Sequence, residues 1–303
     1  MLKVFRVVIT LSIVWFIFMQ IDINLSRLTQ MDLEAWYPKI FLLLFSSFLL
    51  LFAYVISSLA WREIIKDISR IRLSPFRAIS IFLSANLCRY IPGKIWQIGG
   101  LAYFSEKSGI PHSVALYSAI LGQILALAAA SVLSLNAFMK VGTKLTETPW
   151  AIILMGLAII ALIPHVLKWL STNFLTLPEV GSINLPSGWN LLFLKWFGLY
   201  LINWILYVVA FWFFCQSFGI NHSILFLGSA FSGAYLLGYL AIFSPAGLGI
   251  REGSLVILLE PIMLTEQAIL LAVLARIWTT FVEILPGVPL LIRELHSKGK
   301  SSL

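Results

Sequence analysis

The feature that most constrains this chain is a short stretch of helix-breaking and charged residues inside apolar sequence, Phe243–Gly253 (FSPAGLGIREG). It contains one proline, three glycines and the adjacent charges Arg251 and Glu252. In bilayer hydrocarbon an unpaired backbone group costs several kcal/mol, and a charge at mid-depth costs about 2.5–3.5 kcal/mol on insertion scales. Within a membrane, this stretch therefore has to face protein or water rather than lipid.

A second stretch far upstream has the same character. The segment Asn86–Gly100 (NLCRYIPGKIWQIGG) again places a proline, glycines and basic residues inside an apolar run. Matched interruptions in two halves of a membrane protein point to a binding site between structural repeats, as in secondary transporters. The helix breaks that we expect are Pro92, Gly93, Pro245, Gly247 and Gly249.

Composition places the chain in a membrane. Of its 303 residues, 60% are hydrophobic and 11% are charged, with a mean hydropathy of +0.96. A soluble domain of this length needs more polar surface, so the chain is predicted to be a polytopic membrane protein. The net charge of +8 collects at the ends of apolar runs, which favours an anionic cytoplasmic leaflet as the partner and argues against nucleic acid.

Cysteines and histidines give no sign of a disulfide, a metal or a cofactor. Cys88 and Cys215 lie in separate apolar segments without CxxC spacing, and the four histidines share no paired motif. Small buried thiols of this kind are typical of a packed core. We therefore expect no metal site and no cofactor.

Apolar runs long enough to cross the bilayer predict six full spans. A helix rises 1.5 Å per residue and needs about 20 residues to cross some 30 Å of hydrocarbon. The expected spans are the run that follows Arg6 and ends at Ile21, then Ile40–Ala60, Ser113–Ala137, Trp150–Leu170, Trp189–Phe218 and Gln267–Leu291.

Two apolar pieces are too short to cross and predict re-entrant hairpins. The first enters over Ala78–Cys88, turns at Pro92 and Gly93, and returns over Lys94–Phe104. The second comprises Ile224–Ile242 and Glu252–Glu260; a full span over Ile224–Ile242 is the alternative. The sequence thus predicts one all-α membrane domain, residues 1–303, with inverted 3+3 repeats at about 1–140 and 150–295.

Basic residues predict the orientation. The segment Trp61–Arg77 carries five basic residues against two acidic ones, which places it in the cytoplasm together with both termini. We expect the plasma membrane as the location. Within this segment, isoleucines at helical spacing favour an amphipathic helix lying along the inner leaflet. They are Ile64, Ile65, Ile68 and Ile71.

Charged residues inside apolar segments mark the candidate site. Arginine offers planar, bidentate donors to a phosphate, and lysine a point charge. We therefore expect Arg89, Lys94 and Arg251 to bind a headgroup phosphate, with polar lining from Asn86, Gln97, Tyr235 and Tyr239. For Gln123, in the middle of the third span, an interhelical hydrogen bond and a substrate contact both stay open.

Two ion pairs are expected beside that site. Arg276 and Glu283 lie on one face of the last span, since they are seven residues apart. We expect Glu252 to pair with Arg276, and Glu283 to pair with Arg89 or Lys94. Such pairs either only hold the hairpins against the last span or also orient the arginines for a ligand.

The two interrupted stretches also resemble a known family. Arg89–Gln97 (RYIPGKIWQ) and Pro245–Glu252 (PAGLGIRE) are similar to the transmembrane region of the lysylphosphatidylglycerol synthase family, also called the flippase-like domain family. The resemblance covers nearly the whole chain. In bifunctional members this region is linked to translocation of aminoacylated phospholipid, and a separate soluble domain transfers the aminoacyl group. The chain stops about ten residues beyond the last expected span, so the resemblance implies translocation rather than synthesis.

The expected function is therefore a flippase-like transporter that moves a phosphate-bearing lipid headgroup, on a phospholipid or a polyprenyl-linked glycolipid, across the bilayer. One alternative is an accessory subunit for a cell-surface glycolipid glycosyltransferase, and a homo-oligomer also stays open. Another is an intramembrane lipid-modifying enzyme, which would need a base beside a nucleophile. Neither Ser244 nor Ser254 has a histidine in an adjacent motif, so we expect no catalysis.

The predicted topology can be tested by thiol labelling in cells. In a background without Cys88 and Cys215, single cysteines replace Glu106 and Glu260. A membrane-impermeant maleimide should label the second position from outside and the first only after the membrane is opened. Labelling of both positions from the same side would contradict the topology.

Overall fold

The computed structural model describes residues 36–91, 95–145, 189–241, 244 and 247–296. Within these residues the protein is all-helical, which confirms the predicted class. The helices are α3 (Ile40–Ser69), α4 (Pro75–Leu87), the 3-10 helix η2 (Cys88–Tyr90), α5 (Ile95–Glu106), α6 (His112–Leu145), α8 (Trp189–Ser217), α9 (Ile224–Leu240), α10 (Ile250–Leu259) and α11 (Thr265–His296).

Four of these helices, α3, α6, α8 and α11, are long and apolar enough to cross a membrane. Their apolar parts span 27 to 32 residues, more than the roughly 20 that hydrocarbon requires. The chain is therefore a multi-pass membrane protein, and these helices correspond to four of the six predicted spans. The predicted spans ending at Ile21 and over Trp150–Leu170 lie outside the described residues.

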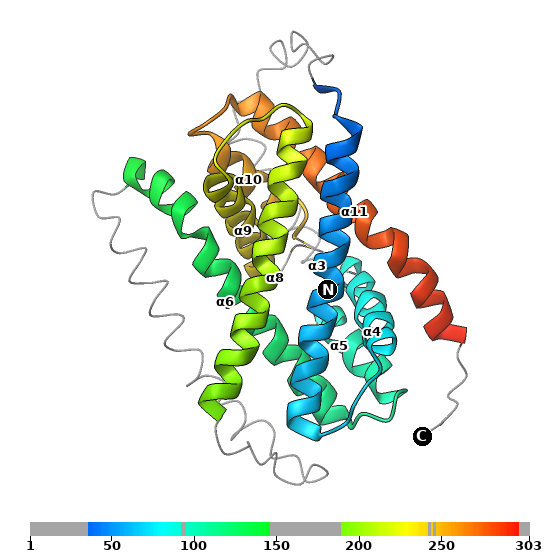
Figure 1. Ribbon diagram of the computed structural model, residues 1–303. Helices are drawn as coiled ribbons and strands as arrows, with labels where there is room; N and C mark the ends of the chain where they lie inside the picture. The colour runs from blue at the N-terminus through cyan, green and yellow to red at the C-terminus, as the bar shows by residue number, and fades with distance from the viewer. Residues whose placement is uncertain (1–35, 92–94, 146–188, 242–243, 245–246, 297–303) are drawn as a thin grey trace, which may run out of the picture.

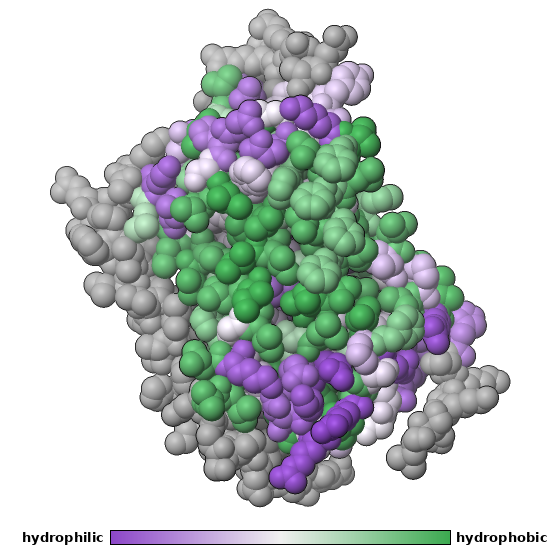
Figure 2. All heavy atoms as spheres, in the orientation of Figure 1, coloured by the Kyte–Doolittle hydropathy of each residue, from purple (hydrophilic) through white to green (hydrophobic). Residues whose placement is uncertain are grey.

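The surface carries a belt that suits lipid. Figure 2 shows a broad hydrophobic band between two hydrophilic ends of the molecule. Many large apolar side chains of the described residues are exposed, among them Phe41, Phe48, Leu194 and Phe281. An apolar surface of this extent is unfavourable in water, so it indicates contact with acyl chains.

The order long helix, two short helices, long helix occurs twice, as α3–α4–α5–α6 and α8–α9–α10–α11. The long helices α3 and α8 lie side by side and run in opposite directions (Figure 1). Each pair of short helices reaches across to the other half. Leu87 at the end of α4 lies against Gly287 of α11, and Phe138 of α6 lies against Gly233 of α9.

The two short-helix pairs lie toward opposite ends of the bundle (Figure 1). The break between α9 and α10 contains Gly247 and Gly249, whose φ angles are +71° and +79°. This left-handed region favours glycine, which has no Cβ to collide with the backbone. Both glycines thus stand at the predicted break, whereas Pro92, Gly93 and Pro245 lie outside the described residues.

The predicted surface helix over Trp61–Arg77 is wrong. Helix α3 continues to Ser69, and a new helix, α4, begins at Pro75 with the Ser74 side chain accepting from the Arg77 N–H. Ile64 packs with residues of α6 and α8, and Ile65 with residues of α4 and α6, so both are buried. Helical spacing of isoleucines is the same for a lipid-facing and a protein-facing stripe, and here the stripe faces protein.

Ion pairs join four helices at the end of the bundle where α3 stops. Glu294 of α11 is fully buried and accepts from Arg77 and Ser80 of α4. Asp67 of α3 accepts from Lys195 and Trp196 of α8, each at 2.8 Å. The positions of these helix ends are therefore fixed by charge as well as by apolar packing.

A glycine contact between α8 and α9 allows a test of the packing. A Cβ added at Gly228 would lie 2.2 Å from Val208 Cγ1, whereas one at Gly198 of α8 meets nothing within 4 Å. Gly228→Ala should separate the two helices and destabilise the fold by about 1–3 kcal/mol. The control Gly198→Ala should be neutral or slightly stabilising, because alanine favours a helix by roughly 0.5–1 kcal/mol.

Thermal unfolding in detergent measures both variants. A Gly228→Ala protein that unfolds at the temperature of the wild type would contradict this packing of α9 on α8.

Candidate functional site

A polar cavity lies in the middle of the bundle, and every helix that the structure describes contributes to its wall. Its volume is about 80 Å³, which is room for several water molecules. We call it the central cavity. Its polar lining consists of Tyr54, Ser57, Asn86, Arg89, Gln97, Gln123, Tyr200, Asn203, Tyr207, Tyr235, Arg251 and Thr279.

A smaller pocket of about 40 Å³ adjoins it, and we call it the arginine pocket. It shares four residues with the central cavity and adds three of its own. The shared residues are Arg89, Gln97, Tyr235 and Arg251, and the added ones are Gly238, Tyr239 and Arg276. Three guanidinium groups from different segments thus meet in one place.

Arg89 pairs with Glu283. Arg89 stands in η2, where the first short-helix pair turns, and its guanidinium contacts the Glu283 carboxylate of α11. Tyr90 also donates its hydroxyl to Glu283 at 2.7 Å. The Glu283 side chain is only 1% exposed, and a buried carboxylate needs such partners because desolvation penalises an unpaired charge by several kcal/mol.

Arg276 pairs with Glu252 in the second half. Arg276 Nε of α11 lies 3.5 Å from Glu252 Oε1 of α10. The other oxygen of Glu252 accepts the Gly249 backbone N–H at 2.6 Å, at the start of α10. A carboxylate is favoured at a helix N-terminus by the free N–H groups and the helix dipole. Both short-helix pairs are therefore tied by charge to the same helix, α11.

Arg251 differs from the other two arginines. It lies in the first turn of α10, with its guanidinium 5.1 Å from the centroid of the Phe231 ring and 5.6 Å from that of Tyr235. Among the described residues it forms no ion pair with a carboxylate within 4.0 Å. Cation–π contact alone stabilises a charge only modestly, by about 0.5–2 kcal/mol.

The charges of the arginine pocket do not balance. Three arginines stand against the two glutamates that pair with Arg89 and Arg276. In the part of the chain that the structure describes, the pocket is therefore positively charged, and the excess charge resides on Arg251. This arrangement attracts an anion.

The sequence-predicted site residues come together, with one exception. Arg89, Arg251, Gln97, Tyr235 and Tyr239 all line the arginine pocket. Asn86 lines the central cavity and accepts a hydrogen bond from Gln97 Nε2 at 2.9 Å. Lys94 lies outside the described residues, so its role stays a prediction, as does its pairing with Glu283.

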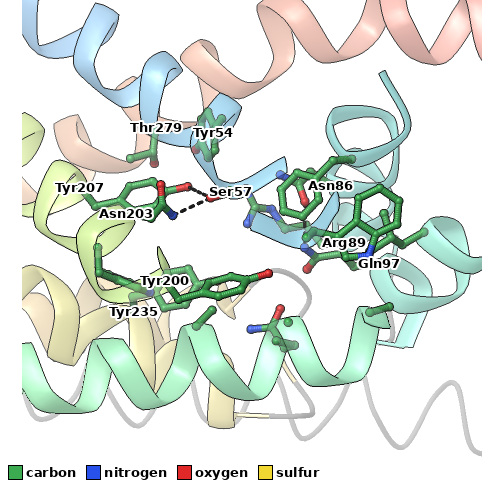
Figure 3. A pocket seen from close by; sticks show the side chains of 18 of the residues that line it. Tyr54, Ser57, Asn86, Arg89, Gln97, Tyr200, Asn203, Tyr207, Tyr235 and Thr279 are labelled. Atoms are coloured by element: carbon green, nitrogen blue, oxygen red, sulfur yellow. Dashed lines mark hydrogen bonds between the residues drawn. The ribbon is translucent and has the colours of Figure 1, made fainter. Parts of the chain in front are cut away.

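The polar residues of α8 were missed at the sequence level. Tyr200, Asn203 and Tyr207 line the central cavity, and Asn203 Nδ2 donates to Ser57 Oγ of α3 at 2.7 Å. In Figure 3, Asn203 and Tyr207 point toward Ser57. Their spacing of three and four residues places all three on one helix face, and this polar stripe in an apolar helix was the signal that could have identified them.

Comparison with known proteins identifies the same family that the two interrupted stretches resemble. A family model described as Lysylphosphatidylglycerol synthase TM region matches residues 3–287. The matched range contains both short-helix pairs and all the residues that line the two pockets. Comparison with curated proteins found no match.

The Arg89–Glu283 pair can be tested by mutation. Glu283→Gln leaves the Arg89 guanidinium buried without its carboxylate, so we expect a loss of about 3–5 kcal/mol in stability. The double variant Arg89→Gln, Glu283→Gln removes both charges and should recover much of that loss. Glu260→Gln, at an exposed glutamate beyond α10, is the matched control and should have little effect.

Unfolding midpoints in detergent of the wild type, Glu283→Gln, the single variant Arg89→Gln and the double variant give the coupling energy as a double-mutant cycle. Additive effects of the two single substitutions would show that the charges do not stabilise one another.

Proposed function

The chain belongs to the lysylphosphatidylglycerol synthase TM region family, and we propose that it is a flippase-like transporter of lipids. In this proposal the arginine pocket binds the phosphate of a lipid headgroup while the acyl chains stay in the bilayer. The protein catalyses no chemical step, and its partner is a membrane lipid with an anionic headgroup.

The observation that carries the proposal is the uncompensated charge of Arg251 inside the bundle. A buried guanidinium is expensive, and phosphate would offset this cost with short, charge-assisted hydrogen bonds in a bidentate geometry. The position in the first turn of α10 adds the field of a helix N-terminus, which also favours an anion. Tyr235 and Tyr239 supply hydroxyl groups in the same pocket.

The architecture supports transport. We propose that the two sets of four helices, together with the two predicted spans outside the described residues, form an inverted 3+3 repeat within one membrane domain. The 17 residues of α9 reach about 26 Å, less than the hydrocarbon thickness, which supports a re-entrant hairpin. The arginine pocket lies where the two hairpins meet, as binding sites of inverted-repeat transporters do.

Charge at the two ends of the bundle supports the orientation. Among the described residues outside the two pockets, the end where α3 and α11 stop has more basic than acidic side chains, and the opposite end has equal numbers. The first end has the basic Arg62, Lys66, Arg70, Arg72, Arg77, Lys107, Lys195 and Arg293 and the acidic Glu63, Asp67, Glu106 and Glu294; the other end has Lys39, Lys140, Glu260 and Glu266. By the positive-inside rule this distribution supports a cytoplasmic location for the first end. We propose that both termini face the cytoplasm, the N-terminus by way of the predicted first span, and that the membrane is the plasma membrane.

The proposal can be tested in vesicles. The purified protein is reconstituted with acyl-chain-labelled phosphatidylglycerol, and a reductant that cannot cross the bilayer reports the labelled lipid in the outer leaflet. The wild type should move the lipid across. Arg251→Gln should slow it about tenfold or more, because a charge-assisted hydrogen bond contributes roughly 1.5–3 kcal/mol. Arg293→Gln, at an exposed arginine near the end of α11, should transport like the wild type.

The other outcomes identify the alternatives. No movement by a folded wild type would contradict the proposal and favour an accessory subunit of a glycosyltransferase. A covalent change of the lipid, seen by mass spectrometry, would favour an enzyme. Equal rates in Arg251→Gln and the wild type would show that phosphate does not bind at this arginine.

A further inference from the structure

The wall of the central cavity divides into two chemically different sides. Asn86, Arg89 and Gln97 lie on one side, and Asn203, Tyr207 and Thr279 lie on the other (Figure 3). Apart from Arg89 and Arg251, the described lining residues carry no charge, and none of them is a carboxylate. The group formed by Asn203, Tyr207 and Thr279 is itself neutral and polar, and we call it the neutral side.

Two amides that line the central cavity have unused hydrogen-bonding atoms. Asn203 is 2% exposed and donates to Ser57 through Nδ2, but its Oδ1 has no partner among the described residues. Gln123 of α6 lines the same cavity, and its buried Nε2 is likewise unsatisfied within the described part of the chain. An unsatisfied buried polar atom costs about 1–3 kcal/mol, so both atoms favour a ligand or water in the cavity.

The unused atoms are one acceptor and one donor. A hydroxyl group both donates and accepts, so a ligand that carries hydroxyl groups can satisfy both kinds of atom. An ammonium group only donates, and a phosphate only accepts. The nearby ring of Trp204, 4.9 Å from Tyr235 and 5.3 Å from Tyr207 between centroids, offers apolar faces to the C–H groups of such a ligand.

We propose that the central cavity binds the uncharged, hydroxyl-bearing part of the headgroup, such as glycerol or a sugar, whose phosphate occupies the arginine pocket. This inference rests on the proposed function and specifies its substrate class. The two pockets share Arg89, Gln97, Tyr235 and Arg251, so one headgroup reaches both. A cationic headgroup is disfavoured, because the described lining offers it no carboxylate and adds the field of two arginines.

The comparison of two headgroups of similar size tests this selectivity. Vesicles receive acyl-chain-labelled phosphatidylglycerol, which ends in a neutral diol, or phosphatidylethanolamine, which ends in an ammonium group. The wild type should move phosphatidylglycerol faster by about fivefold or more, as expected for one or two additional hydrogen bonds. Equal rates that both depend on Arg251 would overturn this inference and leave the proposed function intact. Movement of neither lipid would overturn both.

Substitutions at Asn203 test whether this residue is responsible for the preference between the two headgroups. Asn203→Leu removes the amide at nearly constant volume and should slow phosphatidylglycerol without slowing phosphatidylethanolamine. Asn136→Leu is the matched control, since Asn136 of α6 is also an amide with an unsatisfied buried oxygen but does not line either pocket. Equal slowing of both lipids by Asn203→Leu would overturn the proposed contact.

A second substitution at the same position adds a charge. Asn203→Asp keeps the side-chain shape and adds a carboxylate to the neutral side. The ratio of the two transport rates should shift toward phosphatidylethanolamine, because the new carboxylate can form an ion pair with its ammonium group. An unchanged ratio of the two rates in a folded Asn203→Asp protein would overturn the inference.

Discussion

The structure depends on pairing charges in a part of the protein that lipid surrounds. Hydrocarbon cannot solvate a guanidinium or a carboxylate, so each charge needs a protein partner or a ligand. The pairs Arg89–Glu283 and Arg276–Glu252 meet this requirement, and each joins one short-helix pair to α11. These ion pairs hold both short-helix pairs against α11.

The third arginine is the basis of the proposed function. Because two glutamates compensate two of three arginines, the charge on Arg251 stays available for an anion. The neutral amides and tyrosines of the central cavity lie directly beside it. In our proposal, phosphate recognition and selection of the rest of the headgroup belong to two adjoining pockets, which share four residues but differ at Asn203.

Much of this plan could be predicted from the sequence, because proline, glycine and charge are conspicuous in apolar segments. The bounds of α8 and the two interrupted hairpins follow from run length, and Arg89 and Arg251 from their position at the breaks. The inward packing of Ile64 and the role of Asn203 could not be predicted in the same way. A stripe of isoleucine, or one polar residue in a span, has the same pattern whether it faces lipid, a neighbouring helix or a cavity, and only the tertiary neighbours decide.

The most direct measurement is an experimental structure in a lipid nanodisc that contains phosphatidylglycerol. The account predicts headgroup density in the arginine pocket, with a phosphate oxygen within hydrogen-bond distance of the Arg251 guanidinium and with Glu283 and Glu252 still paired to Arg89 and Arg276. A structure in which Arg251 pairs with a carboxylate, or in which both pockets are closed by side chains and lipid lies only on the outer belt, would contradict it.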